Sequence, residues 1–326
     1  MRIKRQQLLT AAQIARESME RNRVPGLAMA LLCDGEPVQM ETLGLADPAR
    51  NRPVTMRTHF EAASLTKPAF AYLVFRLVDA GVLALDEPLC EYWSEGLPTE
   101  DPRFASATAA HVLSHATGLP NWGPLPLPLS FAPGTGFQYS GSGYTFLQQV
   151  VERRTGRRLD DLMQAEMMDP FGMEDAALIW TRPLNRTLAA TWDDAGVQEP
   201  QRKSARHTVG LAPNAAFSLY VTIADYPKFL TQLLAEPAFA ARVRAVRNPA
   251  GHGVTWGLGW GLYEELLWHW GDNGGFKSFV CFDPDTRDGL LIHTNGANGL
   301  STCFDVAAHC TGFDFSNIAA MVAGAE

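Results

Sequence analysis

Strand-like segments lie at both ends of this 326-residue chain, and this arrangement constrains its fold more than any other feature. Residues 24–47 form two apolar runs around Asp34-Gly35, a dipeptide typical of hairpin turns. Short segments rich in aromatic and β-branched residues return after Gly251. The simplest architecture that buries both sets of strands is one antiparallel sheet built from the two chain ends.

Helical segments and long loops fill the chain between these ends. We therefore predict an α/β fold of the α+β type, in which helices flank the antiparallel sheet and a mostly helical lobe is inserted into it. The sheet domain is expected to be discontinuous and to comprise residues 1–84 and 250–326. The lobe with its long loops is expected to span residues 85–249.

The helical pattern is clearest where an apolar run follows Ser64. Ser64 is expected to open a helix there, because apolar residues recur at helical spacing to about Ala80, and Gly81 stands where a helix C-cap is expected. Three further helices are predicted over residues 159–170, ended by Pro170, over residues 222–235, capped by Thr222 or its neighbours, and from about Ser301 to Ala323.

Charge and cysteine content exclude several classes of protein. The formal net charge is −8, and the densest basic cluster, Arg153–Arg158, resembles a solvated helix end, so we expect no nucleic-acid partner. No apolar run approaches membrane-spanning length, and the first 21 residues form an amphipathic pattern, so we expect no membrane association. The five scattered cysteines cannot all pair and form no C-x-x-C, which favours reduced thiols and a cytoplasmic location.

Ser64 and Lys67 are the first candidate catalytic pair. A helix brings side chains three residues apart onto one face. Burial would lower the pKa of Lys67, so that it could accept the proton of Ser64. A helix-capping serine and a surface lysine would explain the same spacing, because a lone S-x-x-K is common.

Two glycine-containing motifs follow further along the chain. In "YSGSGY", Tyr139 precedes a predicted helix, and nearby positive groups could lower its pKa and make it a base. In "HWGDNGGF", His269 begins a strand whose glycines would let a ligand approach the backbone. Taken singly, the first motif is better explained as a core tyrosine in a turn, and the second as an ordinary strand end.

In this order, the three motifs resemble those of the serine β-lactamase and DD-peptidase superfamily, especially its class C-like branch with related esterases. The likeness runs from about Val24 to Ile292 and includes the stretches "HVLSHATGLP", "MMDPFGM" and "WGLGWG". The resemblance implies an acylated nucleophile at Ser64, with Lys67 and Tyr139 as its proton-handling partners. It also implies that His269 and Gly271 line the site, and that the backbone N–H groups of Ser64 and Asp272 form the oxyanion hole.

Two departures from the family pattern bear on the substrate. Gly141 stands where the second motif usually ends in asparagine, and His269 stands where β-lactamases have lysine. A mostly neutral histidine would hold a substrate carboxylate less firmly than lysine does. The Pro- and Gly-rich loop from Gly118 to Gly136, which contains Trp122, is long enough to suggest a wall of the substrate site.

We therefore predict a serine hydrolase that acts through an acyl-enzyme on a small molecule with an ester or amide carbonyl, without a metal or other cofactor. A β-lactamase, a D-amino-acid peptidase or carboxypeptidase, an acyltransferase and a slowly turning-over sensor remain alternatives. A metallohydrolase built on His111 and His115 is a further alternative, although the helical spacing of the two residues also fits a packing pair. The sequence leaves the oligomeric state open.

Overall fold

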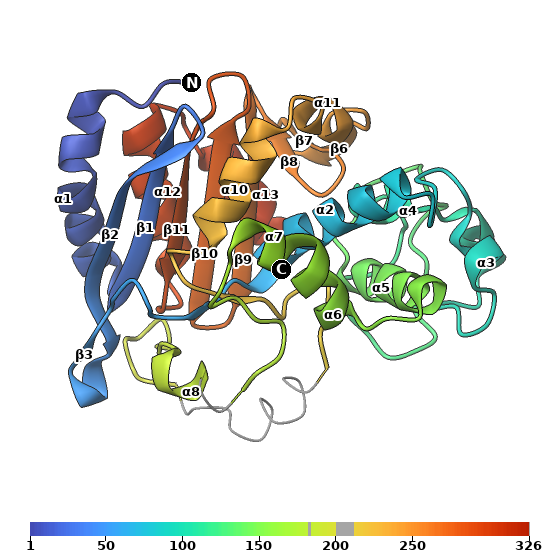
Figure 1. Ribbon diagram of the computed structural model, residues 1–326, viewed down its shortest axis with the longest axis horizontal. Coiled ribbons are helices and arrows are strands. Elements are labelled where there is room, and N and C mark those ends of the chain that lie inside the picture. Colours follow the sequence, from blue (N-terminus) through green and yellow to red (C-terminus); the bar gives the residue numbers. More distant parts are fainter. Residues whose placement is uncertain (182–183, 200–211, 326) are drawn as a thin grey trace.

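The structure is a computed structural model that describes residues 1–181, 184–199 and 212–325 (Figure 1). Within these residues, the main element is a nine-stranded sheet of order β3-β2-β1-β11-β10-β9-β8-β7-β6, with antiparallel neighbours throughout. The two chain ends meet where β1 pairs with β11, with Met29 opposite Ile292. The predicted fold class is thereby confirmed, whereas the domain boundaries stay a prediction.

The strands fall into an N-terminal group, a C-terminal group and a separate two-stranded pair, β4 with β5. Their bounds are β1 Gly26–Cys33, β2 Glu36–Asp47, β3 Arg52–Pro53, β4 Phe60–Glu61, β5 Tyr220–Val221, β6 Asn248–Gly251, β7 Val254–Trp256, β8 Gly261–Tyr263, β9 Leu266–Asn273, β10 Phe276–Asp283 and β11 Asp288–Thr294.

Helices cover the sheet and form the lobe beside it. Figure 1 shows α10 in front of the sheet, α12 behind it, and α3, α4 and α5 grouped on the far side of α2. The longer helices are α1 Arg5–Asn22, α2 Thr66–Asp79, α5 Gly141–Thr155, α10 Tyr226–Ala235, α12 Gly299–Thr311 and α13 Ser316–Ala325. The shorter ones are η1 Pro48–Arg50, η2 Ala63–Leu65, α3 Leu89–Tyr92, η3 Pro102–Ser106, α4 Ala109–Leu113, α6 Leu159–Met163, the π-helical η4 Gln164–Met168, α7 Asp169–Phe171, α8 Leu184–Thr187 and α11 Phe239–Val243.

Two hydrophobic cores lie on opposite faces of the sheet, and β1 contributes to both of them. Successive side chains of a strand point to opposite faces, so a strand that is covered on both sides is apolar throughout. In β1 one alternate set packs with α2 and the lobe, and the other set packs with α1, α12 and α13. The first set is Ala28, Ala30 and Leu32, and the second is Leu27, Met29 and Leu31.

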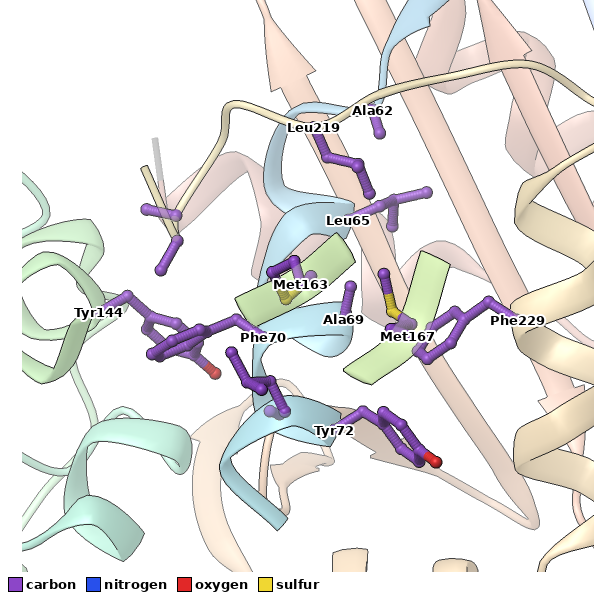
Figure 2. Close-up of a cluster of buried hydrophobic side chains, with 14 of the residues drawn as sticks. Ala62, Leu65, Ala69, Phe70, Tyr72, Tyr144, Met163, Met167, Leu219 and Phe229 are labelled. Carbon is purple, nitrogen blue, oxygen red and sulfur yellow. The ribbon is translucent and has the colours of Figure 1, made fainter. Parts of the chain in front are cut away.

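Helix α2 is the central element of the larger core. Eleven of its fourteen residues are buried, which is typical of a helix that is apolar on all sides. Figure 2 shows its residues Ala69, Phe70 and Tyr72 among side chains from other segments, including Met167 and Phe229. The helix that carries the catalytic motif is therefore held from several directions.

Three of the predicted helix limits are wrong. Pro170 does not end its helix, because it lies in the first turn of α7, where no backbone N–H is needed; Gly172 ends it instead, at φ 66°. Helix α10 begins at Tyr226, with Asp225 rather than Thr222 at its N-cap. The last predicted helix is two helices, because Gly312 at φ 78° ends α12.

Among the described residues, no helix is both long and apolar enough to cross a membrane. The five cysteines are all free thiols, and Cys281, Cys303 and Cys310 are buried.

Candidate active site

Ser64 lies in the tight turn η2, which leads directly into α2, so this helix begins two residues later than predicted. Ala63, just before it, has φ 51°, a left-handed conformation that a residue with a Cβ adopts only at a cost. The Thr66 hydroxyl braces the turn, because it donates to Ala63 O at 2.6 Å and accepts from Leu219 N at 3.0 Å. The turn leaves the Ser64 side chain half-buried, although both of its neighbours are fully buried.

Lys67 reaches Ser64 from the first turn of α2. Its Nζ donates to Ser64 Oγ at 3.0 Å and to the carbonyl oxygen of Ala216 at 3.0 Å. The side chain is 1% exposed, and burial lowers the pKa of Lys67 to about 7. A neutral amine is therefore present near neutral pH, as the sequence predicted for a buried lysine at this position.

Tyr139 completes the group around Ser64. Its ring centre lies 4.7 Å from Lys67 Nζ and 4.6 Å from the Trp270 ring. The expectation of a lowered pKa is wrong, because burial raises the pKa of Tyr139 far more than the nearby Ser64 hydroxyl lowers it. The phenol is therefore protonated at neutral pH, and Lys67 is the group that is ready to accept a proton.

Strand β9 passes close to the turn that carries Ser64. A Cβ at Gly271 would come within 2.3 Å of the Ala62 carbonyl oxygen, so only glycine allows this approach. Asp272 follows on the same strand and lines the same cleft as Ser64. This contact brings the backbone of the two predicted oxyanion-hole residues to the same cleft.

His269 does not lie where the sequence predicted. It is fully buried, it is absent from the cleft lining, and Trp270 lines the cleft instead. Its Nδ1 donates to Trp270 O at 2.7 Å, because a carbonyl oxygen can only accept, so Nε2 carries no proton. Burial and the nearby Lys67 lower the pKa of His269 to about 3, so this histidine offers no positive charge to a substrate carboxylate.

The long loop forms part of the cleft through Asn121 and Trp122. A Cβ at Gly141 would come within 2.3 Å of the Trp122 indole, so the indole occupies the space that a larger side chain would need. Asn121 Oδ1 accepts from Gly141 N at 2.8 Å, which leaves the Nδ2 end free of hydrogen bonds to the described residues. The sequence analysis missed Asn121, whose only signal was its position beside Trp122.

The cleft around Ser64 has a volume of about 470 Å³. Four aromatic residues contribute to its walls, and two of them, Trp122 and Phe217, meet edge to face at 5.7 Å. The lining residues are Ser64, Lys67, Asn121, Trp122, Tyr139, Phe217, Trp270, Asp272, Asn273 and Ala325. Phe217 and Ala325 lie far from every motif and gave no signal in the sequence.

A second cavity of about 440 Å³ adjoins the first at Tyr139. The two cavities share Asn121, Tyr139 and Ala325, and the end of α13 forms part of both walls. Tyr139 therefore stands between two spaces, and only the first of them contains Ser64.

The charges at the cleft largely cancel. The Asp272 carboxylate forms an ion pair with Lys277 on the neighbouring strand β10 and accepts from Gly274 N at 3.0 Å. Lys67 is the one cationic side chain among the residues that line the cleft, and its lowered pKa removes much of that charge at neutral pH. Among the described residues, the cleft therefore presents no free cation for a carboxylate.

His111 and His115 do not converge on a common point. Thr108 N donates to His111 Nδ1, whereas Ser140 N donates to His115 Nδ1. Within the part of the chain that the structure describes, no group of three or more His, Cys, Asp or Glu side chains is placed to hold a metal ion.

Comparisons with known proteins identify the family and the fold. A family model described as Beta-lactamase matches residues 11–305. The chain is 30% identical over 326 residues to esterase EstB of Burkholderia gladioli, and the match covers 82% of this chain and 78% of the esterase. Among solved structures, a class C β-lactamase aligns with a TM-score of 0.80 at 18% identity, covering 94% of this chain and 96% of that one. D-alanine carboxypeptidase AmpC from Burkholderia cenocepacia aligns with a TM-score of 0.79 at 19% identity, covering 94% and 99%.

Proposed function

Because the chain belongs to the β-lactamase family and is a serine hydrolase, we propose that it hydrolyses small uncharged esters through an acyl-enzyme on Ser64. The observation that carries this proposal is the contact of 3.0 Å between Ser64 Oγ and a buried lysine whose pKa is about 7. That pair supplies a nucleophile and a neutral base in a cleft whose described lining residues offer no free cation.

In the first half of the reaction, Lys67 Nζ takes the proton of Ser64 as Oγ bonds to the ester carbonyl carbon. The carbonyl oxygen gains the negative charge and is stabilised by the backbone N–H groups of Ser64 and Asp272. The bond to the leaving alkoxide then breaks. Its proton comes from the Tyr139 hydroxyl, which regains one from the Lys67 ammonium.

In the second half, water replaces the alcohol. The Tyr139 hydroxyl accepts a proton from the water as the water oxygen bonds to the acyl carbon, and it passes its own proton to Lys67 Nζ. The reverse transfer then delivers a proton to Ser64 Oγ as the acyl bond breaks. The enzyme ends in its starting protonation state, and the products are one carboxylic acid and one alcohol. Amides would follow the same route with a poorer leaving group.

The substrate class follows from the cleft walls. Four rings, of Trp122, Tyr139, Phe217 and Trp270, favour an apolar or aromatic acyl group, because burial of apolar area drives its binding. Penicillins and D-alanyl peptides carry a carboxylate, and it would meet Asp272, already paired with Lys277, rather than a free cation.

We therefore predict that kcat/KM for p-nitrophenyl butyrate exceeds that for nitrocefin or a D-Ala-D-Ala peptide by about tenfold or more at pH 7.5, because 1.4 kcal/mol of lost binding is a factor of ten. Steady-state assays of the three substrates side by side measure this ratio. A nitrocefin value above that of the ester would contradict the proposed substrate class and favour a β-lactamase.

The ion pair at the cleft provides a matched test. Asp272→Asn keeps the backbone N–H but frees Lys277 to attract a carboxylate, so the nitrocefin KM is expected to fall while the butyrate KM changes little. Asp285→Asn, in the turn after β10, removes one carboxylate away from the cleft and serves as the control for overall charge. Equal responses of the two variants would show that the local pair does not govern selectivity.

An acyltransferase remains a second candidate because of the cavity on the other side of Tyr139. An acceptor alcohol there would lie beside the phenol that exchanges protons with the leaving group. Short alcohols added during turnover distinguish the two activities. Ester exchange that outpaces hydrolysis at millimolar alcohol would favour acyl transfer, and unchanged acid release would favour the hydrolase.

A further inference from the structure

His115 contacts the ring of Tyr139 and the backbone of both residues beside it in the chain, although it lines neither cavity. The main-chain carbonyl of His115 accepts from Gln138 N at 2.9 Å, and its Nδ1 accepts from Ser140 N at 3.1 Å. The imidazole ring lies against the phenol with ring centres 4.3 Å apart. One residue thus holds the backbone on both sides of Tyr139 and one face of its ring.

The contact to Ser140 requires a neutral imidazole of one tautomer. Nδ1 can accept only without a proton, so the proton of the neutral ring is on Nε2. Full burial, together with Lys67 and His269 nearby, lowers the pKa of His115 well below its usual value, so the accepting form persists across the working pH range.

Packing alone does not account for a histidine here. Aromatic rings surround it, including Tyr144 at 5.4 Å and Trp256 at 5.2 Å, and its buried Nε2 has no hydrogen-bond partner among the described residues. An unpartnered buried polar atom costs stability, so phenylalanine would suit such an environment better. His115 also has φ 54°, a costly conformation of the kind that clusters at functional sites.

Tyr139 needs support of this kind because its buried hydroxyl has no well-formed hydrogen bond among the described residues, and the nearby group that acts on it is the reacting hydroxyl of Ser64. The phenol has to stay free to exchange a proton with Ser64, Lys67 and the leaving group. Its direction must therefore come from its backbone and from its ring faces, where His115 and Trp270 lie at 4.3 and 4.6 Å.

We propose that His115 is a positioning residue that fixes the Tyr139 phenol for proton transfer to the leaving group, through its Nδ1 contact with Ser140 N and its ring contact with Tyr139. This inference rests on the proposed acyl-enzyme reaction and adds to it a residue outside the three motifs. Removal of His115 would lower kcat and leave KM largely unchanged. The decrease in kcat would be larger for an alkyl ester, whose leaving alkoxide needs a proton, than for a p-nitrophenyl ester.

Two amide substitutions test whether the hydrogen bond from Ser140 N to His115 Nδ1 is needed, or only a side chain that fills the space. His115→Asn places its amide oxygen near the position of Nδ1, and asparagine tolerates a positive φ, whereas His115→Gln carries its amide further out, near Nε2. We expect His115→Asn to keep kcat for ethyl butyrate within about fivefold, and His115→Gln to lose about 50-fold, the scale of a catalytic group displaced by about 1 Å. His111→Asn, at a half-buried histidine that does not contact Tyr139, is the control and should keep wild-type kcat.

A double-mutant cycle with Tyr139→Phe decides whether His115 acts through the phenol. In the Tyr139→Phe background, His115→Gln is expected to cause no further loss of kcat for ethyl butyrate, and thermal unfolding of every variant checks the fold. If His115→Gln does not fold, His115→Phe takes its place, because it also lacks the acceptor. Losses that multiply in the double variant, or equal kcat for the Asn and Gln variants, would overturn the inference while leaving the acyl-enzyme mechanism intact. A harmless Tyr139→Phe would overturn the proton path itself.

Discussion

Replacing Ser64 with alanine is expected to lower kcat by at least about 10⁴-fold, the scale seen when a serine hydrolase loses its nucleophile. No other hydroxyl among the cleft-lining residues can form the acyl-enzyme with Lys67, because Tyr139 is held protonated by burial. The fold should survive, since the Ser64 side chain caps no helix and, among the described residues, interacts through its hydroxyl with Lys67 and Tyr139 alone. Stopped assays of p-nitrophenyl butyrate hydrolysis, with thermal unfolding as the check on folding, measure both results.

Ser142→Ala is the matched control for this variant. Its hydroxyl donates to the Asn121 carbonyl near the same cleft but does not contact Lys67, so turnover should stay within a few-fold of wild type. A fluorophosphonate probe should label Ser64, as mapped by peptide mass spectrometry. Labelling of Ser140 or Ser142 instead, or retention of turnover in Ser64→Ala, would show that the nucleophile is misassigned.

Lys67→Arg is expected to abolish turnover almost as completely as Lys67→Ala, because a guanidinium does not release its proton at working pH. In the wild-type enzyme, kcat/KM should rise with pH through about 7 and then level off, as Lys67 becomes neutral. A pH–rate profile between pH 5 and 9 measures this rise in kcat/KM. Near-normal activity of Lys67→Arg would make this residue an electrostatic support and not a base.

The same lowered pKa has a consequence for stability that is independent of kinetics. Between the folded pKa of about 7 and the unfolded value near 10.4, the unfolded chain binds one more proton at Lys67 than the folded chain does. The free energy of unfolding should therefore rise with pH across this window, by up to about 1.4 kcal/mol per pH unit from this residue. Lys67→Met lacks this contribution, so its unfolding free energy, followed by urea denaturation from pH 7 to 9, should rise less steeply. Parallel slopes would show that the lysine keeps an ordinary pKa.

Local patterns in the sequence were enough to place the main elements and the three motifs. The spacing of Ser64 and Lys67 brought the two side chains together because residues three apart meet on one helix face, whatever the helix packs against. Alternation and turn chemistry likewise identified the hairpin at Asp34-Gly35 and the strand through His269. These features depend on neighbours in the chain, and the structure reproduces them.

Local patterns failed at helix limits where the stop signal was ambiguous. A proline within a helical pattern can end a helix or lie in the first turn of the next one, and at Pro170 the second case holds. A glycine deep in an apolar helical pattern can be tolerated or can end the helix, and at Gly312 a left-handed φ ends α12.

The sheet built from two chain ends and the order of the catalytic motifs could be read from the amino-acid sequence, because periodicity and short spacings encode them, and the motifs indicated the family by resemblance. Which groups face the cleft, and which charges they carry, became known from the three-dimensional packing. It placed His269 in the core and Trp270 in the wall, laid Trp122 over Gly141, and set His115 against Tyr139. Those contacts join segments more than ten residues apart, and the pKa values depend on burial. Neither is encoded in local spacing, because both arise only when distant parts of the chain pack together.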